Sequence, residues 1–189
     1  MLFSSQLLDN STFMFIFAEK FSMKKNVLIE LLESGDKVSL YSPRFEGEEF
    51  TEFERFLLTY KDNYAEDIQI LIRRLDIIKN RGAEDRYFRY EGSKRDRVMA
   101  LPSHLDTSTL RLYCLNISHK VLILGNGGVK KTQTYQEDHI LNRAVQNLQK
   151  IDIIIRRLEN KGIVTINGTN INGPLEITIN IDDIEEELL

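Results

Sequence analysis

The chain contains few of the residues that build disulfide frameworks or metal centres. Its 189 residues include one cysteine, three histidines, three prolines and no tryptophan. One cysteine cannot form a disulfide within the chain, and Cys114 lies in an apolar run, as is typical of a buried, reduced thiol in a cytoplasmic protein. The histidines at positions 104, 119 and 139 show no metal-ligand spacing. We therefore predict no metal site and no other cofactor.

Long hydrophobic runs are also missing. The short apolar run Phe13–Ala18 has no basic segment before it and no small-residue cleavage site, and it is too short to cross a bilayer. We therefore expect neither a membrane span nor a signal peptide. No internal repeat or low-complexity linker divides the chain, so we expect one domain. Residues 1–161 form its main part, and residues 162–189 add a hairpin and an acidic tail to the same domain.

Basic residues are absent from the end of the chain, and the net charge of -4 conceals this asymmetry. Residues 1–80 hold 10 Lys and Arg against 14 Asp and Glu, residues 81–161 hold 15 against 9, and residues 162–189 hold none against 6. The basic middle segment favours an anionic partner such as nucleic acid, although a solvated surface has a similar composition. The acidic tail is either solubilising or folds over the basic face.

Apolar periodicity predicts an α+β fold. Helical spacing recurs from Phe50 to Tyr60, from Tyr64 to Ile78, and from Ile140 to Leu158. Strands are predicted at 13–17, 37–41, 86–91, 97–101, 110–117, 121–124, 163–166 and 175–181, while 26–32 reads as a strand or a short helix. The strands at 86–124 predict an antiparallel meander, and those after residue 162 predict a C-terminal hairpin around Asn167-Gly168.

The segment from Leu110 to Arg143 contains the residues best suited to chemistry. Two apolar runs lead into a glycine-rich stretch, Gly125–Gly128, which we predict to be a loop, and then into a Lys-Lys pair. Arg111 lies within an apolar strand, where a charge is costly unless it is paired, for example with Asp106, or faces a cleft. Cations beside a phenol and an imidazole suit the handling of a phosphodiester.

The stretch Gly125–Thr132 also invites comparison with a phosphate-binding P-loop. That motif requires glycine at the place of Lys130 and belongs to a parallel sheet, whereas the preceding strands look antiparallel. Nucleotide binding of this kind is therefore a weak alternative.

The order of these motifs resembles the RelE/ParE/HigB superfamily of bacterial toxins, most closely its HigB-like, phage Gp49-like branch. The resemblance lies in Leu110-Arg111-Leu112-Tyr113, in Val121–Leu124, in Val129–Thr134 and in Glu137–Ala144, and it covers roughly residues 37–160. It implies a small antiparallel sheet packed by an N-terminal helical hairpin and a long C-terminal helix, here with an extra C-terminal β-hairpin.

The resemblance also implies a function. It implies the toxin component of a type II toxin–antitoxin system, a metal-independent mRNA endoribonuclease in the cytoplasm, with a cognate antitoxin, mRNA and the ribosome as partners. It assigns catalysis to Arg111, Lys131 and Tyr135, and we add His139 because an imidazole titrates near neutrality. Arg95, Arg97, His104 and Lys130 are predicted to bind RNA.

Two features of the chain leave an alternative open. Where active relatives often have a basic second strand, this chain has Val98–Pro102, with its basic residues displaced to Lys94, Arg95 and Arg97. The chain is also acidic overall. A non-enzymatic interaction protein, either a gyrase-binding relative or a catalytically inactive one, therefore remains the alternative to a nuclease.

Overall fold

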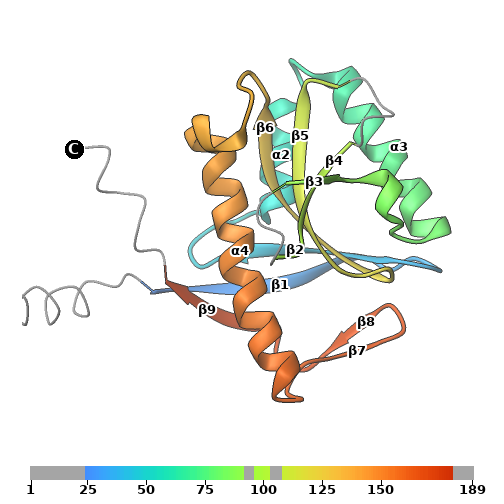
Figure 1. Cartoon of the computed structure of the whole chain (residues 1–189), viewed down its shortest axis with the longest axis vertical. Coiled ribbons are helices and arrows are strands. Elements are labelled where there is room, and N and C mark those ends of the chain that lie inside the picture. Colours follow the sequence, from blue (N-terminus) through green and yellow to red (C-terminus); the bar gives the residue numbers. More distant parts are fainter. Residues whose placement is uncertain (1–23, 92–95, 103–107, 181–189) are drawn as a thin grey trace, which may run out of the picture.

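The computed structural model describes residues 24–91, 96–102 and 108–180, and a single large sheet organises them (Figure 1). Its seven strands lie in the order β3-β4-β5-β6-β2-β1-β9. Their bounds are β1 (Lys24–Glu33), β2 (Ser39–Phe45), β3 (Arg89–Tyr90), β4 (Val98–Leu101), β5 (Leu110–Ser118), β6 (Val121–Val129) and β9 (Glu176–Asn180). Neighbouring strands are antiparallel except β2 and β6, which run parallel over Ser39–Tyr41 and Val121–Ile123.

Three α-helices in the described ranges pack against this sheet: α2 (Glu52–Tyr60), α3 (Ala65–Arg81) and α4 (His139–Asn160). Thr51 and Glu54 form a capping box that fixes the start of α2. The Asp138 carboxylate starts α4 by accepting hydrogen bonds from the backbone N–H groups of Ile140 (2.9 Å) and Leu141 (3.1 Å). None of the helices in the described part of the chain is long and apolar enough to span a membrane.

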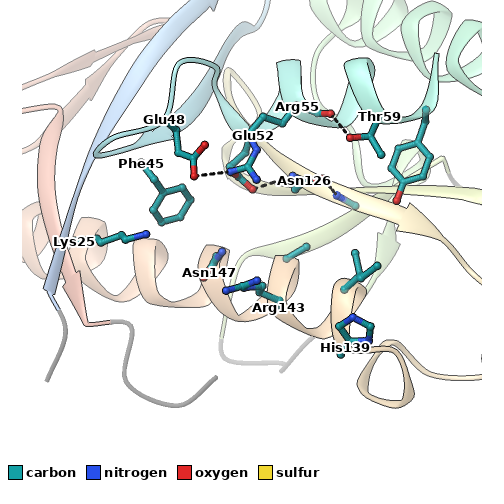
Figure 2. Close-up of a pocket in the computed structure, with 14 residues that line it drawn as sticks. Lys25, Phe45, Glu48, Glu52, Arg55, Thr59, Asn126, His139, Arg143 and Asn147 are labelled. Atoms are coloured by element: carbon teal, nitrogen blue, oxygen red, sulfur yellow. Dashed lines mark hydrogen bonds and ion pairs between the residues drawn. The ribbon is translucent and has the colours of Figure 1, made fainter. Parts of the chain in front are cut away.

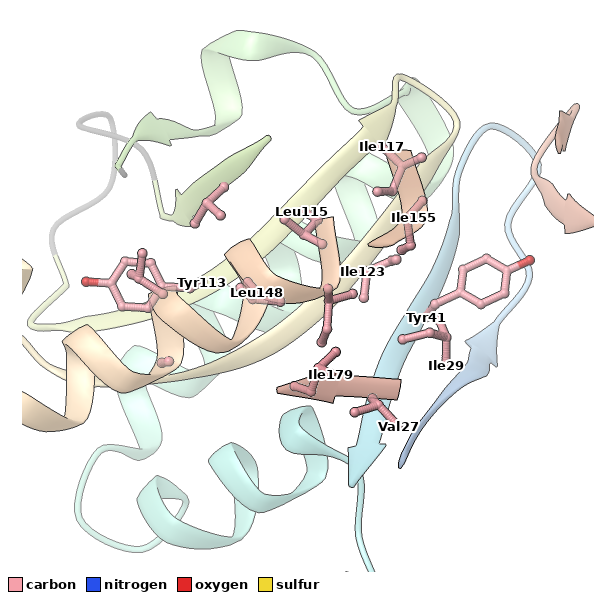
Figure 3. Close-up of a cluster of buried hydrophobic side chains, with 14 of the residues drawn as sticks. Val27, Ile29, Tyr41, Tyr113, Leu115, Ile117, Ile123, Leu148, Ile155 and Ile179 are labelled. Carbon is pink, nitrogen blue, oxygen red and sulfur yellow. The ribbon is translucent and has the colours of Figure 1, made fainter. Parts of the chain in front are cut away.

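The sheet separates two apolar cores because successive side chains of a strand point to opposite faces. On one face Tyr113, Leu115 and Ile123 pack with Leu148 and Ile155 of α4 (Figure 3). On the other face, Leu112, Cys114 and Leu122 pack with apolar side chains of α2 and α3. Each large aliphatic side chain buried in this way contributes about 1.5–3 kcal/mol. This arrangement places the odd-numbered residues of β5 on the α4 face.

The predicted architecture, a small antiparallel sheet with an N-terminal helical hairpin and a long C-terminal helix, is wrong. The sheet has seven strands and is mixed, not small and antiparallel. The difference lies mainly in β1 and β9, which extend the sheet beyond β2. Val27, Ile29, Ile177 and Ile179 are buried there. Alternating apolar residues of this kind indicate a strand but do not identify its neighbour, so sequence reasoning left both segments outside the sheet.

The predicted C-terminal hairpin is wrong in its second strand. Two three-residue strands, β7 (Thr165–Asn167) and β8 (Asn170–Asn172), pair with each other and form a separate sheet. Gly168 adopts the positive φ of 62° that the tight turn between them requires. The segment predicted to complete the hairpin is instead β9, which pairs with β1 at the edge of the main sheet.

The predicted glycine loop is also wrong, because Gly125–Gly128 lie within β6. A Cβ atom at Gly127 would lie 1.8 Å from the Arg111 carbonyl oxygen on β5. Glycine is therefore required here for close approach of two backbones, not for loop flexibility. Because these residues are extended and paired with an antiparallel strand, they do not have the arrangement of a P-loop.

Candidate functional site

The candidate site begins with a row of side chains across three strands on the α4 face of the sheet. Arg89 of β3 pairs with Ala100 of β4, and Ala100 pairs with Tyr113 of β5. Paired residues of adjacent strands point to the same face. Arg111 lies two residues before Tyr113 on the same face of β5.

Arg111 is 7% exposed, which is unusual for a guanidinium. Its Nη1 donates to the carbonyl oxygens of Ser108 (2.8 Å) and Leu110 (2.7 Å), while its Nε is buried and has no hydrogen-bond partner among the described residues. Burial, and then the neighbouring charge of Arg89, lower the pKa of Arg111. A buried cation with an unused donor is costly, and a bound anion would offset that cost.

The phenol of Tyr113 lies near this guanidinium, and the phenol of Tyr135 packs against Tyr113. The rings of Tyr113 and Tyr135 meet edge to face with their centroids 6.3 Å apart, and the buried Tyr113 hydroxyl has no partner among the described residues. Burial raises the pKa of both phenols, and the carboxylates of Asp96 and Glu91 raise that of Tyr135 further. Both therefore hold their protons at neutral pH and act as hydrogen-bond donors or acids, not as bases.

A carboxylate that sequence reasoning missed lies among these groups. Glu91 forms an ion pair with Lys130 (3.6 Å), and its charge acts on Arg111, Tyr113 and Tyr135. Its side chain is 13% exposed. The signal that could have found it is the alternation of the predicted strand 86–91, which places Arg89 and Glu91 on one face. We call the six residues together the arginine cluster: Arg89, Glu91, Arg111, Tyr113, Lys130 and Tyr135.

The arginine cluster contains three of the predicted site residues. Arg111 precedes Tyr113 by two residues on β5, the Tyr135 ring packs against that of Tyr113, and Lys130 is linked to the cluster by its ion pair with Glu91. Lys131 follows on the surface and forms no hydrogen bond or ion pair with the described residues. The predicted phosphodiester chemistry requires cations and a phenol to lie close together. The position of Tyr135 depends on the short helix η2 (Tyr135–Glu137), which was not predicted.

The remaining predicted residues lie elsewhere. Arg95 and His104 lie outside the described residues, as does Asp106, the carboxylate considered as a partner for Arg111. Arg97 forms ion pairs with Asp152 (2.6 Å) and Glu159 (3.0 Å) of α4, which favours a structural role for its guanidinium.

His139 begins α4 and lines a separate pocket of about 390 Å³ between α2 and α4 (Figure 2). Tyr135 is not among the residues that line it, so the two groups considered for proton transfer serve different surfaces.

In the described part of the chain, no three His, Cys, Asp or Glu side chains are grouped so as to hold a metal ion. The site therefore consists of cations, phenols and one carboxylate.

No protein-family profile, curated protein or solved structure matches this chain.

Proposed function

We propose that this protein is the toxin component of a bacterial type II toxin–antitoxin system and cleaves mRNA in the cytoplasm, with the arginine cluster as its phosphodiester site. The observation that carries the proposal is the buried guanidinium of Arg111, whose Nε is unused among the described residues. Its charged and polar neighbours include the phenol of Tyr113 and the carboxylate of Glu91, which is paired with Lys130, and Tyr135 packs against Tyr113. The HigB-like motif order of the sequence supports the same activity.

In the proposed reaction the 2′-hydroxyl of the RNA attacks the adjacent phosphorus. The 2′-oxygen–phosphorus bond forms as the phosphorus–5′-oxygen bond breaks, which leaves a 2′,3′-cyclic phosphate and a 5′-hydroxyl. In this scheme Glu91 takes the proton of the 2′-hydroxyl, and Tyr135 gives its proton to the 5′-oxygen. This scheme needs no metal ion.

Arg111 stabilises the charge that develops on the phosphorane oxygens. Its planar guanidinium presents two donors to a phosphate, and in a buried site such a contact is stronger than in water. Arg89, Lys130 and Lys131 add positive charge around it and bind the flanking phosphates. The same cationic surface would be recognised by the acidic groups of an antitoxin, and the ribosome is a further partner of toxins of this kind.

Induction of the protein in a bacterial host, with transcript 5′ ends mapped across the transcriptome, tests this proposal. Growth arrest with new transcript ends is expected for the wild type, and Tyr135→Phe should abolish both. The Tyr135 hydroxyl forms no hydrogen bond with the described residues, so its removal should leave the fold intact. Arg157→Ala, which removes an exposed arginine of α4, is the matched control and should behave like the wild type.

The other outcomes contradict the proposal in distinguishable ways. Growth arrest without new transcript ends would indicate that the protein acts on a protein target such as gyrase and not on RNA. Neither arrest nor new ends, with the protein folded, would identify an inactive interaction protein. Arrest and cutting that persist in Tyr135→Phe and in Arg111→Lys would show that the arginine cluster is not the catalytic site.

A further inference from the structure

The pocket between α2 and α4 exists because the sheet opens there. β2 and β6 are paired over only three residues, and beyond Ile123 the two strands separate. Phe45 at the end of β2 and Asn126 of β6 lie on the two sides of the opening, and α2 and α4 close it from opposite faces (Figure 2). Its volume of about 390 Å³ is within the ~300–1,000 Å³ usual for small-molecule sites.

One wall of the pocket is a fixed hydrogen-bond acceptor. Glu52, only 8% exposed, accepts hydrogen bonds from Asn126 Nδ2 (3.0 Å) and Arg55 Nη1 (3.1 Å). Arg55 also pairs with Glu48 (3.3 Å), and Asn126 Oδ1 accepts from the Gly127 N–H (2.8 Å). A carboxylate accepts about four hydrogen bonds, so Glu52 retains acceptor capacity toward the pocket. The network holds these side chains in place before any ligand binds.

The opposite wall is cationic. Arg143 and His139 project from α4 and Lys25 from β1, facing the Glu48–Arg55 side across the pocket (Figure 2). None of the three forms an ion pair or side-chain hydrogen bond with the described residues. The two walls therefore offer an anion site and an acceptor site in one pocket, and the Phe45 ring adds an apolar surface to its lining.

We propose that this pocket binds one guanosine nucleotide of the RNA substrate. The phosphate lies against Arg143 and Lys25, and the base lies toward Glu52. Guanine presents adjacent N1–H and N2–H donors on one edge, which a carboxylate accepts together, whereas the same edge of adenine has an unprotonated N1. A site of this kind makes RNA binding depend on the presence of a guanosine. The choice of RNA as the ligand rests on the proposed function. The cationic and acceptor side chains that line the pocket are observed independently of that function.

Calorimetric titration of the full chain with guanosine 5′-monophosphate tests the inference, with adenosine 5′-monophosphate and inorganic phosphate as comparison ligands. Saturable binding with a preference for the guanine nucleotide is expected. Arg143→Ala should weaken it about tenfold or more, the usual loss for a charged hydrogen bond to phosphate. Glu52→Gln should remove the preference for guanine, and Arg157→Ala should bind as the wild type does.

Absence of binding at millimolar nucleotide, or an equal loss in Arg143→Ala and Arg157→Ala, would overturn the inference. Because Arg143 is exposed and unpaired among the described residues, its removal leaves the fold intact. The two proposals fail separately. RNA cleavage without nucleotide binding would overturn the proposed nucleotide site and support the proposed nuclease activity. Nucleotide binding without RNA cleavage would support the nucleotide site and overturn the nuclease activity.

Discussion

Removal of Arg97 should destabilise the fold strongly because it would leave a buried carboxylate short of partners. Asp152 of α4 is 1% exposed and accepts hydrogen bonds from Arg97 Nε (2.6 Å), from the Arg97 backbone N–H (3.2 Å) and from Arg156 Nε (2.9 Å). The first two bonds join α4 to the residue that precedes β4. Arg97 has an 18% exposed side chain, so this ion pair is largely shielded from solvent.

Loss of one partner from a buried ion pair costs about 3–5 kcal/mol, and the partial exposure of Arg97 places Arg97→Met near the lower end, at about 3 kcal/mol. For a chain of this size that corresponds to a fall in Tm of about 6–12 °C. Replacement of both side chains by apolar groups avoids leaving the carboxylate short of a charged partner. The double variant Arg97→Met, Asp152→Leu should therefore be more stable than the sum of the single changes by about 2 kcal/mol.

Urea unfolding of the wild type, both single variants and the double variant, followed by circular dichroism, measures this coupling directly. A loss below about 1 kcal/mol in Arg97→Met, or additive single effects, would refute the reasoning. Such a result would show that Arg97 is available for the RNA contact assigned to it from sequence.

Three further results are expected. Gly127→Ala should reduce the free energy of unfolding by several kcal/mol because the added Cβ meets the rigid backbone of β5. In Gly125→Ala the added Cβ meets the Leu148 side chain at 2.8 Å, so the loss of free energy of unfolding should be smaller. Thermal unfolding of the two variants checks this. Burial would raise the pKa of Asp67, but hydrogen bonds from Ser108 and from the Thr109 N–H (2.8 Å) lower it. The Asp67 carboxylate therefore stabilises the fold above pH ~4, the pKa of an unfolded Asp. This contribution is lost as the pH falls through the lower pKa of Asp67 in the folded protein. Asp67→Asn should accordingly cost about 1–2 kcal/mol at pH 7 and little at pH 2–3, by urea unfolding at both pH values. Cys114 is fully buried and burial raises its pKa, so a thiol reagent should modify it only at the rate of unfolding; fast modification of the native protein would contradict its position in β5.

The helices could be predicted because each has an apolar stripe that repeats with the helical period. Apolar residues from Leu141 to Ile155 recur on one face of α4, and those of α3 recur in the same way, so the predicted ranges lie close to the observed ones. This information is local to each helix. It does not indicate which face of a sheet a helix covers.

The sheet could not be predicted in full because strand pairing depends on partners far apart in sequence. β1 pairs with β9 about 150 residues later, and β2 joins β6 in parallel. Gly125–Gly128 were misassigned for a related reason. Glycine is typical of loops, and the close approach of β5 that requires Gly127 is visible only in three dimensions.

For the candidate site, the sequence predicted residue types better than their neighbours. Arg111 was singled out because a charge within an apolar strand is unusual, and the fold buries its side chain. Glu91 was missed because a carboxylate at the end of a strand is common on any surface. The acceptor wall formed by Glu52 and Asn126 was missed because 74 residues separate the two, and only the folded chain joins them.

Cleavage of a defined RNA by the purified protein, with the product ends identified by mass spectrometry, tests directly whether the arginine cluster is a ribonuclease site. The expected products carry 2′,3′-cyclic phosphate and 5′-hydroxyl ends. Arg111→Lys and Tyr135→Phe should each lower the rate at least a hundredfold, and Arg157→Ala should leave it unchanged. Intact RNA after incubation with the folded wild type, or cleavage that Arg111→Lys and Tyr135→Phe do not slow, would contradict that assignment.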